Sequence, residues 1–485
     1  MEPAPGTVHE VSGAAAGRRA TIARMHAMRP ADVTVVGLGP GAPDLATGAA
    51  LAALTSARLV WLRTARHPAR AVIPASVPVR ACDDLYEARA TFDQVYRAIA
   101  ERVVASAAEG PVVYAVPGDP TVGEASVTRI RALAAHAGLT VAVVPGVSFL
   151  GPTLGVLGWD ALDGLQVVDA TALAARHYPD LDPDRPALVA QVYNRLLASD
   201  VKLVLLAAYP PDHPVTVVAA AGAAGTRAET VPLVDLDRGL ALDDLTTLAV
   251  PPLPGPGAVA ALADLVARLR APDGCPWDRE QTHRSLRPYL LEEAYEVLQA
   301  LDDDDPDALR EELGDLLLQI VLHCQLAAEA GLFTLPQVVA VICDKIVRRH
   351  PHVFGDAAAH TSAEVRVRWE DLKRREKGDA GPERGPLDGL PAALPALARA
   401  QAAQRKLHDA GRDGAPAPSD WDEETATRAA TVLGVDPGGA EARARRVGGA
   451  LWALAAEAGA WDVDAESALR EEIAAREAAE RRGRP

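Results

Sequence analysis

The chain has 485 residues, of which 49% are hydrophobic and 24% charged, and its formal net charge is −17. This length favours about three domains at ~150 residues each, and the apolar content suffices for sizeable cores. The acidic balance disfavours nucleic acid as a partner, because no basic field is available to attract a phosphate backbone. No uninterrupted apolar run approaches the ~20 residues of a membrane span, so no membrane partner is expected.

The cysteines and the N-terminal residues indicate the compartment. A sparse set of cysteines without ligand-type spacing favours a reducing compartment, and hence a cytoplasmic location. The four are Cys82, Cys275, Cys324 and Cys343. Residues 1–30 contain no apolar segment of signal-peptide type, and we expect them to form a disordered extension.

Residues 31–250 are expected to form an α/β domain. A strand at 33–36 runs into the glycine-rich loop 37–44, which precedes a helix at about 47–56 and a strand at 59–62. Strand, turn, helix and strand in this order are typical of an α/β unit. Glycines permit positive φ and close approach of the backbone to a ligand, but Pro40 breaks the dinucleotide-binding fingerprint. Taken alone, the loop is equally well explained as a tight turn.

Two further loops repeat this arrangement. Pro117-Gly118-Asp119-Pro120 follows a strand at 112–116, and Pro145-Gly146-Val147-Ser148 follows a helix at 124–137 and a strand at 140–144. A further strand is expected at 202–207. With these three loops, residues from about 31 to 240 resemble the tetrapyrrole methylase family, which binds S-adenosylmethionine in a cleft between two α/β halves.

This resemblance implies a set of cofactor-binding residues. They are Gly37, Gly39, Gly41, Gly118 and Asp119. An Asp between Gly and Pro is also a common turn former, so Asp119 has a purely structural alternative. His213, between Asp212 and Pro214, is expected to be a surface turn residue. No basic cluster or metal-ligand set identifies a tetrapyrrole pocket, so cofactor binding and methyl transfer both stay open.

A proline-rich linker, Pro251–Gly257, starts a second domain at 251–380. After a helix at 258–269, four acids form two pairs with three-residue spacing. They are Glu293 with Glu296, and Glu312 with Asp315. Residues at i and i+3 share one face of a helix, so each pair can point its carboxylates in one direction.

The residues between the two pairs predict a helix break. Asp302-Asp303-Asp304-Asp305-Pro306 places Asp305 as N-cap and Pro306 at the first position of a second helix. The apolar stripe expected on this second helix comprises Leu313, Leu316, Leu317, Ile320 and Val321.

Four converging carboxylates would repel one another unless a cation neutralised them. Hard oxygen ligands without Cys or His favour Mg²⁺, with Mn²⁺ as the alternative. The competing interpretation is that the acids form solvated helix faces, as most charged pairs do.

Two further motifs accompany the carboxylates and complete a resemblance to the MazG family. The acids read Glu-Glu-x-x-Glu (292–296) and Glu-x-x-Asp (312–315), and Gly274-Cys275-Pro276-Trp277-Asp278 and Arg348–Phe354 flank them. MazG proteins are all-α nucleoside triphosphate pyrophosphohydrolases that cleave an NTP to NMP and pyrophosphate using magnesium. The resemblance therefore implies a hydrolase, nucleoside triphosphates as substrates, and a homodimer.

The remaining site residues are assigned around this centre. Glu292 is the candidate catalytic residue, orienting or deprotonating water or binding a second metal; a helix-surface acid explains it equally well. The expected substrate-binding residues are Trp277, Asp278, Lys345, Arg348, Arg349, Trp369 and Lys373. The basic ones suit phosphate, although cations also favour the C-terminal turn of a helix. Trp277 suits either stacking on a base or packing, and Asp278 either a base edge or a helix cap.

Residues 387–485 are expected to be a degenerate second MazG-like helical domain, beginning with a helix at 390–407. The acids are missing where the metal ligands would recur, so a role in dimer contacts is expected. The sequence thus favours an NTP pyrophosphohydrolase fused to a methylase-like domain, and removal of non-standard nucleotides is a role that would suit it. The alternative is an S-adenosylmethionine-dependent methyltransferase whose helical half is regulatory.

Overall fold

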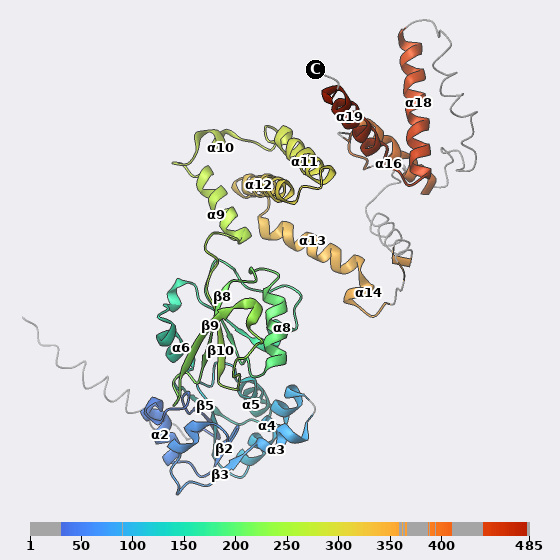
Figure 1. Ribbon diagram of the computed structural model, residues 1–485. Coiled ribbons are helices and arrows are strands. Elements are labelled where there is room, and N and C mark those ends of the chain that lie inside the picture. The colour runs from blue at the N-terminus through green and yellow to red at the C-terminus, as the bar shows by residue number, and fades with distance from the viewer. Residues whose placement is uncertain are drawn as a thin grey trace, which may run out of the picture. The chain divides into compact units, whose positions relative to one another are not determined.

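The structure is a computed structural model that describes residues 31–89, 91–357, 361, 364–365, 387, 389–392, 394–409 and 440–482. The expected extension at 1–30 lies outside these ranges. The chain divides into two compact units after Val339. Within the described ranges, every helix is too short or too polar to be a membrane span. The first unit holds two five-stranded sheets and a helical part (Figure 1).

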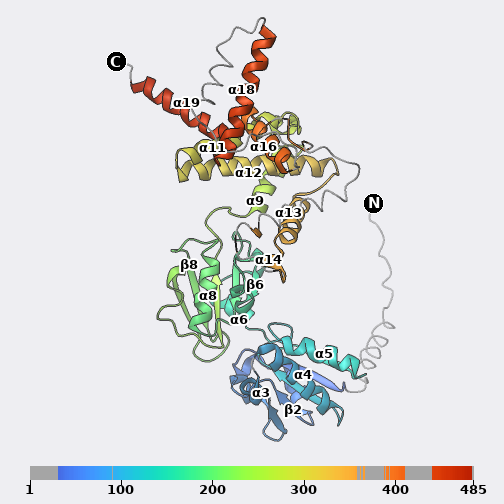
Figure 2. The same ribbon diagram turned by 90° about the vertical axis from the view of Figure 1, so that its right-hand side faces the viewer.

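The first sheet is parallel, in the order β3-β2-β4-β1-β5. Its strands are β1 (Val33–Gly37), β2 (Val60–Leu62), β3 (Val79–Ala81), β4 (Val112–Val116) and β5 (Val141–Val144). Its helices are α2 (Gly48–Thr55), α3 (Asp83–Ala88), α4 (Phe92–Ala107) and α5 (Ala125–His136). Alternate residues of β1 face opposite cores: Val35 packs with α4 and α5, whereas Val36 packs with α2. Figure 2 shows α4 and α5 side by side.

The second sheet is mixed, in the order β6-β7-β10-β8-β9, with only β6 and β7 parallel. Its strands are β6 (Gln166–Asp169), β7 (Ala187–Ala190), β8 (Pro214–Ala219), β9 (Arg227–Pro232) and β10 (Thr246–Val250). Its helices are α6 (Leu150–Leu157), α7 (Ala170–Ala174) and α8 (Arg195–Leu205). The two sheets confirm the expected α/β class of this part.

Two predictions in this part were wrong. Residues 202–207 were expected to be a strand, but 202–205 belong to α8, whose N-cap Asn194 accepts a hydrogen bond from the Leu197 amide at 2.9 Å. Its buried residues Leu197, Val201 and Val204 recur every three or four positions, which is the period of a helix. His213 was expected at the surface, but it is buried, and its Nε2 lies 3.0 Å from the carbonyl oxygen of Pro251.

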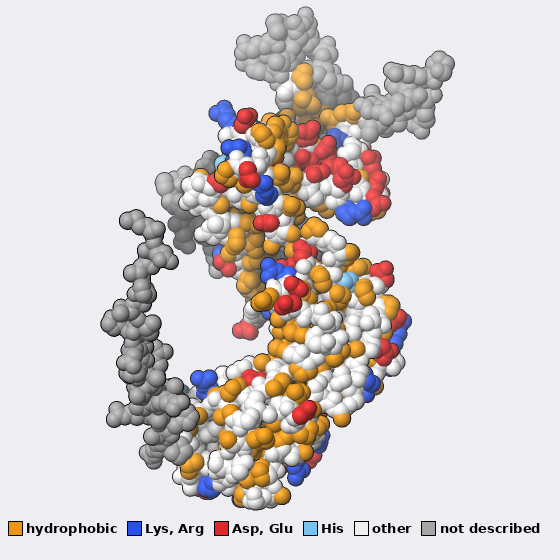
Figure 3. Space-filling view, turned by 90° about the vertical axis from the view of Figure 1, so that its left-hand side faces the viewer, with side chains coloured by type: hydrophobic (Ala, Val, Ile, Leu, Met, Phe, Trp, Pro, Cys, Tyr) orange, Lys and Arg blue, Asp and Glu red, His pale blue; other side chains and the backbone are white. Residues whose placement is uncertain are grey.

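The helical part of the first unit begins with α9, close to the predicted start. Its helices are α9 (Val259–Arg270), α10 (Pro276–Glu280), α11 (Arg287–Asp302) and α12 (Pro306–Glu329), and α13 (Leu335–Arg349) crosses the boundary into the second unit. Val266, Leu286, Val321 and Leu322 form its small buried core. Figure 3 shows acidic side chains gathered densely on a helical part of the chain and scattered elsewhere.

The apolar stripe predicted for α12 is only partly buried in the single chain. Val321 is buried, but Leu313, Leu317 and Ile320 are exposed by 49%, 37% and 42%. The buried face of α12 instead turns Val321 and Leu322 toward α9 and Leu286. The leucine-rich surface is wider than one stripe, so its sequence alone did not specify which side would meet a neighbouring helix.

The regular elements described in the second unit are all helices. Its helices are α14 (Pro351–Phe354), α16 (Ala396–Asp409), α18 (Ala440–Ala460) and α19 (Ala465–Arg482). The helix expected from residue 390 begins at Ala396, directly after Pro395. Gln404 is buried and donates to the Trp452 carbonyl oxygen at 2.7 Å, which joins α16 to α18.

Candidate functional site

The turn between α11 and α12 positions the two acidic pairs. Asp304 adopts a φ of 52°, a left-handed conformation that Asp tolerates better than most residues. Asp305 then caps α12, accepting hydrogen bonds from the amides of Asp307 and Ala308 at 3.0 and 3.1 Å. Pro306 occupies the first turn, as predicted. The chain thereby reverses, and α12 runs back beside α11.

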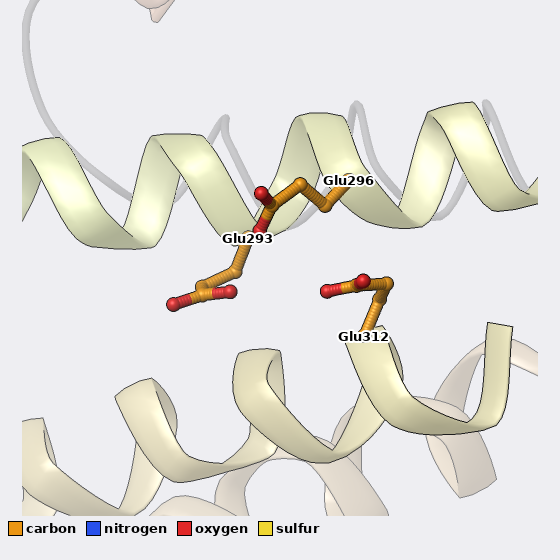
Figure 4. A group of neighbouring side chains, drawn as sticks. All are labelled: Glu293, Glu296 and Glu312. Carbon is orange, nitrogen blue, oxygen red and sulfur yellow. The ribbon is translucent and has the colours of Figure 1, made fainter. Parts of the chain in front are cut away.

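This reversal brings three of the four predicted metal ligands together. One carboxylate oxygen each of Glu293, Glu296 and Glu312 lies within 4.8 Å of the other two. Figure 4 shows Glu293 and Glu296 on one helix and Glu312 on the other, with their carboxylates turned toward one another. Asp315 does not join this group of three, although it lies one turn beyond Glu312 on α12.

The electrostatics of the cluster reflect its crowding. Partial burial, and then the charges of Asp315 and Glu296, raise the pKa of Glu293. Desolvation, and then the charges of Glu296 and Asp315, raise the pKa of Glu312. Asp315 is therefore close enough to act on both helices' acids even though it is outside the group of three. A bound cation would reverse these shifts, because it favours the ionised form of each carboxylate.

The donor set fits a small divalent cation. Ligands of one octahedral Mg²⁺ at ~2.1 Å lie about 3–4 Å from one another, and the three glutamate oxygens already lie within 4.8 Å. Their side chains are exposed or half-buried, so small rotations can close the difference. All donors are carboxylate oxygens, which magnesium and manganese prefer. Glu292 is exposed on α11 beside this group.

The segment before α11 is held by contacts that the sequence did not indicate. The side chain of Arg270 is only 7% exposed and forms a bidentate ion pair with Glu329, with nitrogen–oxygen distances of 2.9 and 2.8 Å; it also donates to the carbonyl oxygen of Asp278. A Cβ on Gly274 would lie 2.2 Å from the Leu269 carbonyl oxygen, so only glycine fits there. Arg270 thus ties α9 and α12 to the segment that carries Trp277 and Asp278.

The two predicted residues of that segment have different surroundings. Trp277 is 51% exposed and meets Tyr289 edge to face at 5.9 Å, so most of its face stays open. Asp278 is half-buried on the short helix α10. Nearby, His283 and His323 stack with their Nδ1 atoms 2.8 Å apart. Burial, and then the neighbouring His283, lower the pKa of His323.

The basic residues predicted to bind substrate that the structure describes lie in the second unit. Lys345, Arg348 and Arg349 are on α13 beyond Val339, as expected from the sequence. Trp369 and Lys373 lie outside the described residues. The substrate-binding role of all five stays a prediction.

The glycine loops of the first sheet pack against one another. Gly39 and Gly118 form a two-way backbone bridge, with nitrogen–oxygen distances of 3.1 and 2.8 Å. A Cβ on Gly37 would lie 2.6 Å from the Gly118 carbonyl oxygen and the Gly146 amide nitrogen. Asp119 is buried and accepts from the amide of Gly146 at 3.0 Å.

These contacts show that several of the predicted cofactor-binding residues allow the loops to pack closely. Gly41 has a φ of 150°, and a Cβ there would lie 2.5 Å from the side chain of Ala223. Gly118 has a φ of 62° but open space at the Cβ position. Cofactor binding by these loops therefore stays a prediction.

Comparison with known proteins follows the same division of the chain. The family model for tetrapyrrole (corrin/porphyrin) methylases matches residues 32–237, and the model for the MazG nucleotide pyrophosphohydrolase domain matches residues 281–354. A nucleoside triphosphate pyrophosphohydrolase of Escherichia coli K12 is 48% identical over 153 residues, which are 31% of this chain and 58% of that protein.

Two relatives share longer segments. A nucleoside triphosphate pyrophosphohydrolase of Mycolicibacterium smegmatis is 34% identical over 243 residues, or 48% of this chain and 72% of that protein. YabN of Bacillus subtilis, described as uncharacterized, is 40% identical over 378 residues, which are 77% of this chain and 76% of YabN. The chain therefore belongs to the same family as YabN, and it joins a tetrapyrrole methylase-type domain to a MazG domain.

Proposed function

We propose that the helical part of this chain is a Mg²⁺-dependent nucleoside triphosphate pyrophosphohydrolase, which converts an NTP and water to NMP and pyrophosphate. The observation that carries the proposal is the convergence of Glu293, Glu296 and Glu312 from two helices. It coincides with the match to the MazG domain and with relatives named for this activity in E. coli and M. smegmatis. Removal of non-standard nucleotides is the role we propose for the reaction.

The residues divide the work as follows. Glu293, Glu296, Glu312 and Asp315 would hold the cation, which when bound supplies positive charge to the triphosphate oxygens. Glu292 is the proposed base that orients a water molecule and takes its proton. The water oxygen bonds to the α-phosphorus while the bond from that phosphorus to the bridging oxygen breaks, and pyrophosphate leaves.

The basic side chains of α13 are the proposed partners of the leaving group. Guanidinium groups suit phosphate oxygens because they donate two parallel hydrogen bonds. We assign this task to Arg348 and Arg349, with Lys345 as a point charge. Trp277, with its open face, is the proposed base-stacking residue.

A panel of nucleoside triphosphates, assayed for pyrophosphate with and without Mg²⁺, tests the proposal. We expect pyrophosphate and NMP in equal amounts, and none after chelation of the metal. Release of single phosphates, or product formation that chelation leaves unchanged, would contradict it.

We also propose that the protein is a homodimer. Leu313, Leu317 and Ile320 of α12, together with Leu298 of α11, are exposed in the single chain, although such side chains favour burial. A second copy would cover them, and small all-α domains commonly complete their cores in this way.

A second candidate function is methyl transfer from S-adenosylmethionine, with the helical half as a regulator. It is favoured by the match of residues 32–237 to the methylase family and by the juxtaposed glycine loops. The intact carboxylate cluster weighs against a purely regulatory helical half. Calorimetry with S-adenosylmethionine tests it: tight binding would support a cofactor site, and no heat at millimolar cofactor would remove this candidate.

A further inference from the structure

A cavity of about 660 Å³ lies between elements of the two sheets. The predicted cofactor residues Gly37, Gly39, Gly41, Gly118 and Asp119 are not among its lining residues, but the cavity adjoins them, because Pro120 and Thr121 line it and the Thr121 amide donates to Asp119. Its walls come instead from α4, the start of α5, the end of β6 and the segment after β7. Its volume is within the range of small-molecule sites.

One wall of the cavity is aromatic. Phe92 and Tyr96, both on α4, stack at 6.2 Å, and Tyr193, which follows β7, meets Phe92 edge to face at 6.3 Å. Phe92 is 50% exposed, so this wall is not closed by other side chains. Open aromatic faces of this kind favour a planar ligand, because flat rings stack on them.

Two acidic side chains also line the cavity. Glu124 is buried in its wall, where its Oε1 pairs with Arg63 at 3.0 Å and its Oε2 accepts from the Ser126 hydroxyl at 3.3 Å. Asp169 also lines the cavity, and the hydrogen bonds that it accepts from the described residues all end on Oδ1, which leaves Oδ2 for a ligand. Among the described residues of the lining, Arg131 is the single basic side chain, and it is exposed.

These charges discriminate between two kinds of ligand. Because Glu124 is already paired with Arg63, the cavity does not need a full positive charge from its ligand. Carboxylate oxygens with unused lone pairs accept hydrogen bonds from neutral N–H groups. A planar ring with neighbouring N–H donors therefore satisfies both walls better than an organic cation.

The backbone of the lining is also unusual. Gln191, which lines the cavity, has a φ of 64°, which is uncommon for a residue other than glycine. Its side-chain nitrogen would lie 3.0 Å from a Cβ on Gly123 of the facing loop, so both residues are held in a tight arrangement. Strained conformations of this kind cluster at ligand sites.

We infer that this cavity binds a planar nitrogen heterocycle with adjacent N–H and amino donors, stacked on Phe92 and Tyr96, with Tyr193 at its edge, and hydrogen-bonded to Asp169 and Glu124. Guanine and pterin rings both present this donor edge. Adenine does not, because its corresponding ring nitrogen is an acceptor.

Calorimetry on the full chain tests the inference with guanosine, pterin and 1-methylguanosine. Nucleosides lack the triphosphate of the proposed hydrolase substrate. We expect guanosine or pterin to bind, and whichever binds identifies the source of the ring. If guanosine binds, 1-methylguanosine should bind at least about tenfold more weakly, because the methyl group replaces the ring N–H donor.

Variants separate stacking from hydrogen bonding. Phe92→Ala should weaken binding of the preferred ring about tenfold through lost stacking, whereas Tyr178→Ala, at an exposed aromatic outside the lining, should not. Asp169→Asn retains an N-cap oxygen but replaces an acceptor by a donor. It should therefore weaken guanosine or pterin binding while the fold persists.

Three results with the rings themselves would overturn the inference, and a fourth comes from a cationic probe. They are the absence of binding by both rings at millimolar concentration, equal affinities for guanosine and 1-methylguanosine, and binding that Phe92→Ala leaves unchanged. Tetramethylammonium binding in place of the rings would also overturn it, because the cavity would then be a cation site.

Discussion

The sheets and the α11–α12 pair of this chain differ in how far their side chains are buried and paired. In the first sheet, Val33, Val35 and Val36 are fully buried, and the glycine loops contact one another through backbone atoms. In the helical pair, Leu313 is 49% exposed and three like-charged carboxylates converge. The sheets bury their apolar side chains within the single chain. The helical pair leaves apolar side chains exposed and carboxylates unneutralised, as expected of a surface that binds a metal ion and a second subunit.

The largest expected effect is the loss of hydrolysis when the carboxylate cluster is changed. Glu293→Gln or Asp315→Asn should lower pyrophosphate release at least about 100-fold, because each removes a charge from the proposed cation site. Circular dichroism should show unchanged helices. Glu311→Gln, at a neighbouring exposed acid of α12, is the matched control and should retain activity. Undiminished release in either variant would refute the ligand assignment.

Glycine substitutions test whether close backbone packing at the glycine loops stabilises the first sheet. Gly37→Ala should cost about 3 kcal/mol or more of unfolding free energy, because its Cβ would press on two backbone atoms at 2.6 Å. Gly118→Ala, with open space but a φ of 62°, should cost only about 1–2 kcal/mol. Denaturant unfolding measures both values, and equal costs would contradict the packing account.

The buried ion pair beside the first sheet predicts a pH dependence. Burial outweighs Arg63 and raises the pKa of Glu124 from its usual value near 4.5 to about 7. The folded chain therefore binds more protons than the unfolded chain between these values, so stability should fall as the pH rises from 4.5 to 7, by up to about 3 kcal/mol.

Unfolding at pH 5 and pH 7.5, compared between the parent chain and Glu124→Gln, isolates this contribution. The variant cannot titrate at this position, so its pH dependence should be flatter. An identical dependence in the two proteins would show that Glu124 does not titrate in this range.

The smallest effect should come from the exposed apolar face of the helices. Leu317→Arg should weaken self-association by roughly tenfold or more, because it places a charge where an apolar contact is proposed. Light scattering over a dilution series measures this. Leu196→Arg, at a 79% exposed leucine of α8, is the control and should not change association. If the parent chain itself is monomeric in this measurement, the proposed homodimer is wrong.

Local chemistry made part of the fold predictable from the sequence. Asp305 and Pro306 determined the start of α12 because a cap and a first-turn proline act on their own neighbours. The spacing of three along each helix likewise identified Glu293 and Glu296 as a pair from the sequence alone. These inferences need no knowledge of distant contacts.

Other features depended on contacts that spacing does not encode. The short apolar run at 202–207 suits either a strand or the end of a helix. It is helical in the structure because residues of α8 pack against the second sheet. Arg270 and Glu329 form an ion pair although they are 59 residues apart in the sequence, and no local pattern indicates that pair. The cavity likewise joins residues of both sheets that no single motif contains.

Binding of Mn²⁺, followed by electron paramagnetic resonance, tests most directly whether the acids of α11 and α12 gather a cation, because its readout does not depend on turnover. We predict saturable binding by the full chain, competition by Mg²⁺, and at least about tenfold weaker binding in Glu293→Gln and Glu312→Gln. Glu311→Gln should bind as the parent does. Equal Mn²⁺ affinity in the parent and in both cluster variants would contradict the proposed cation site.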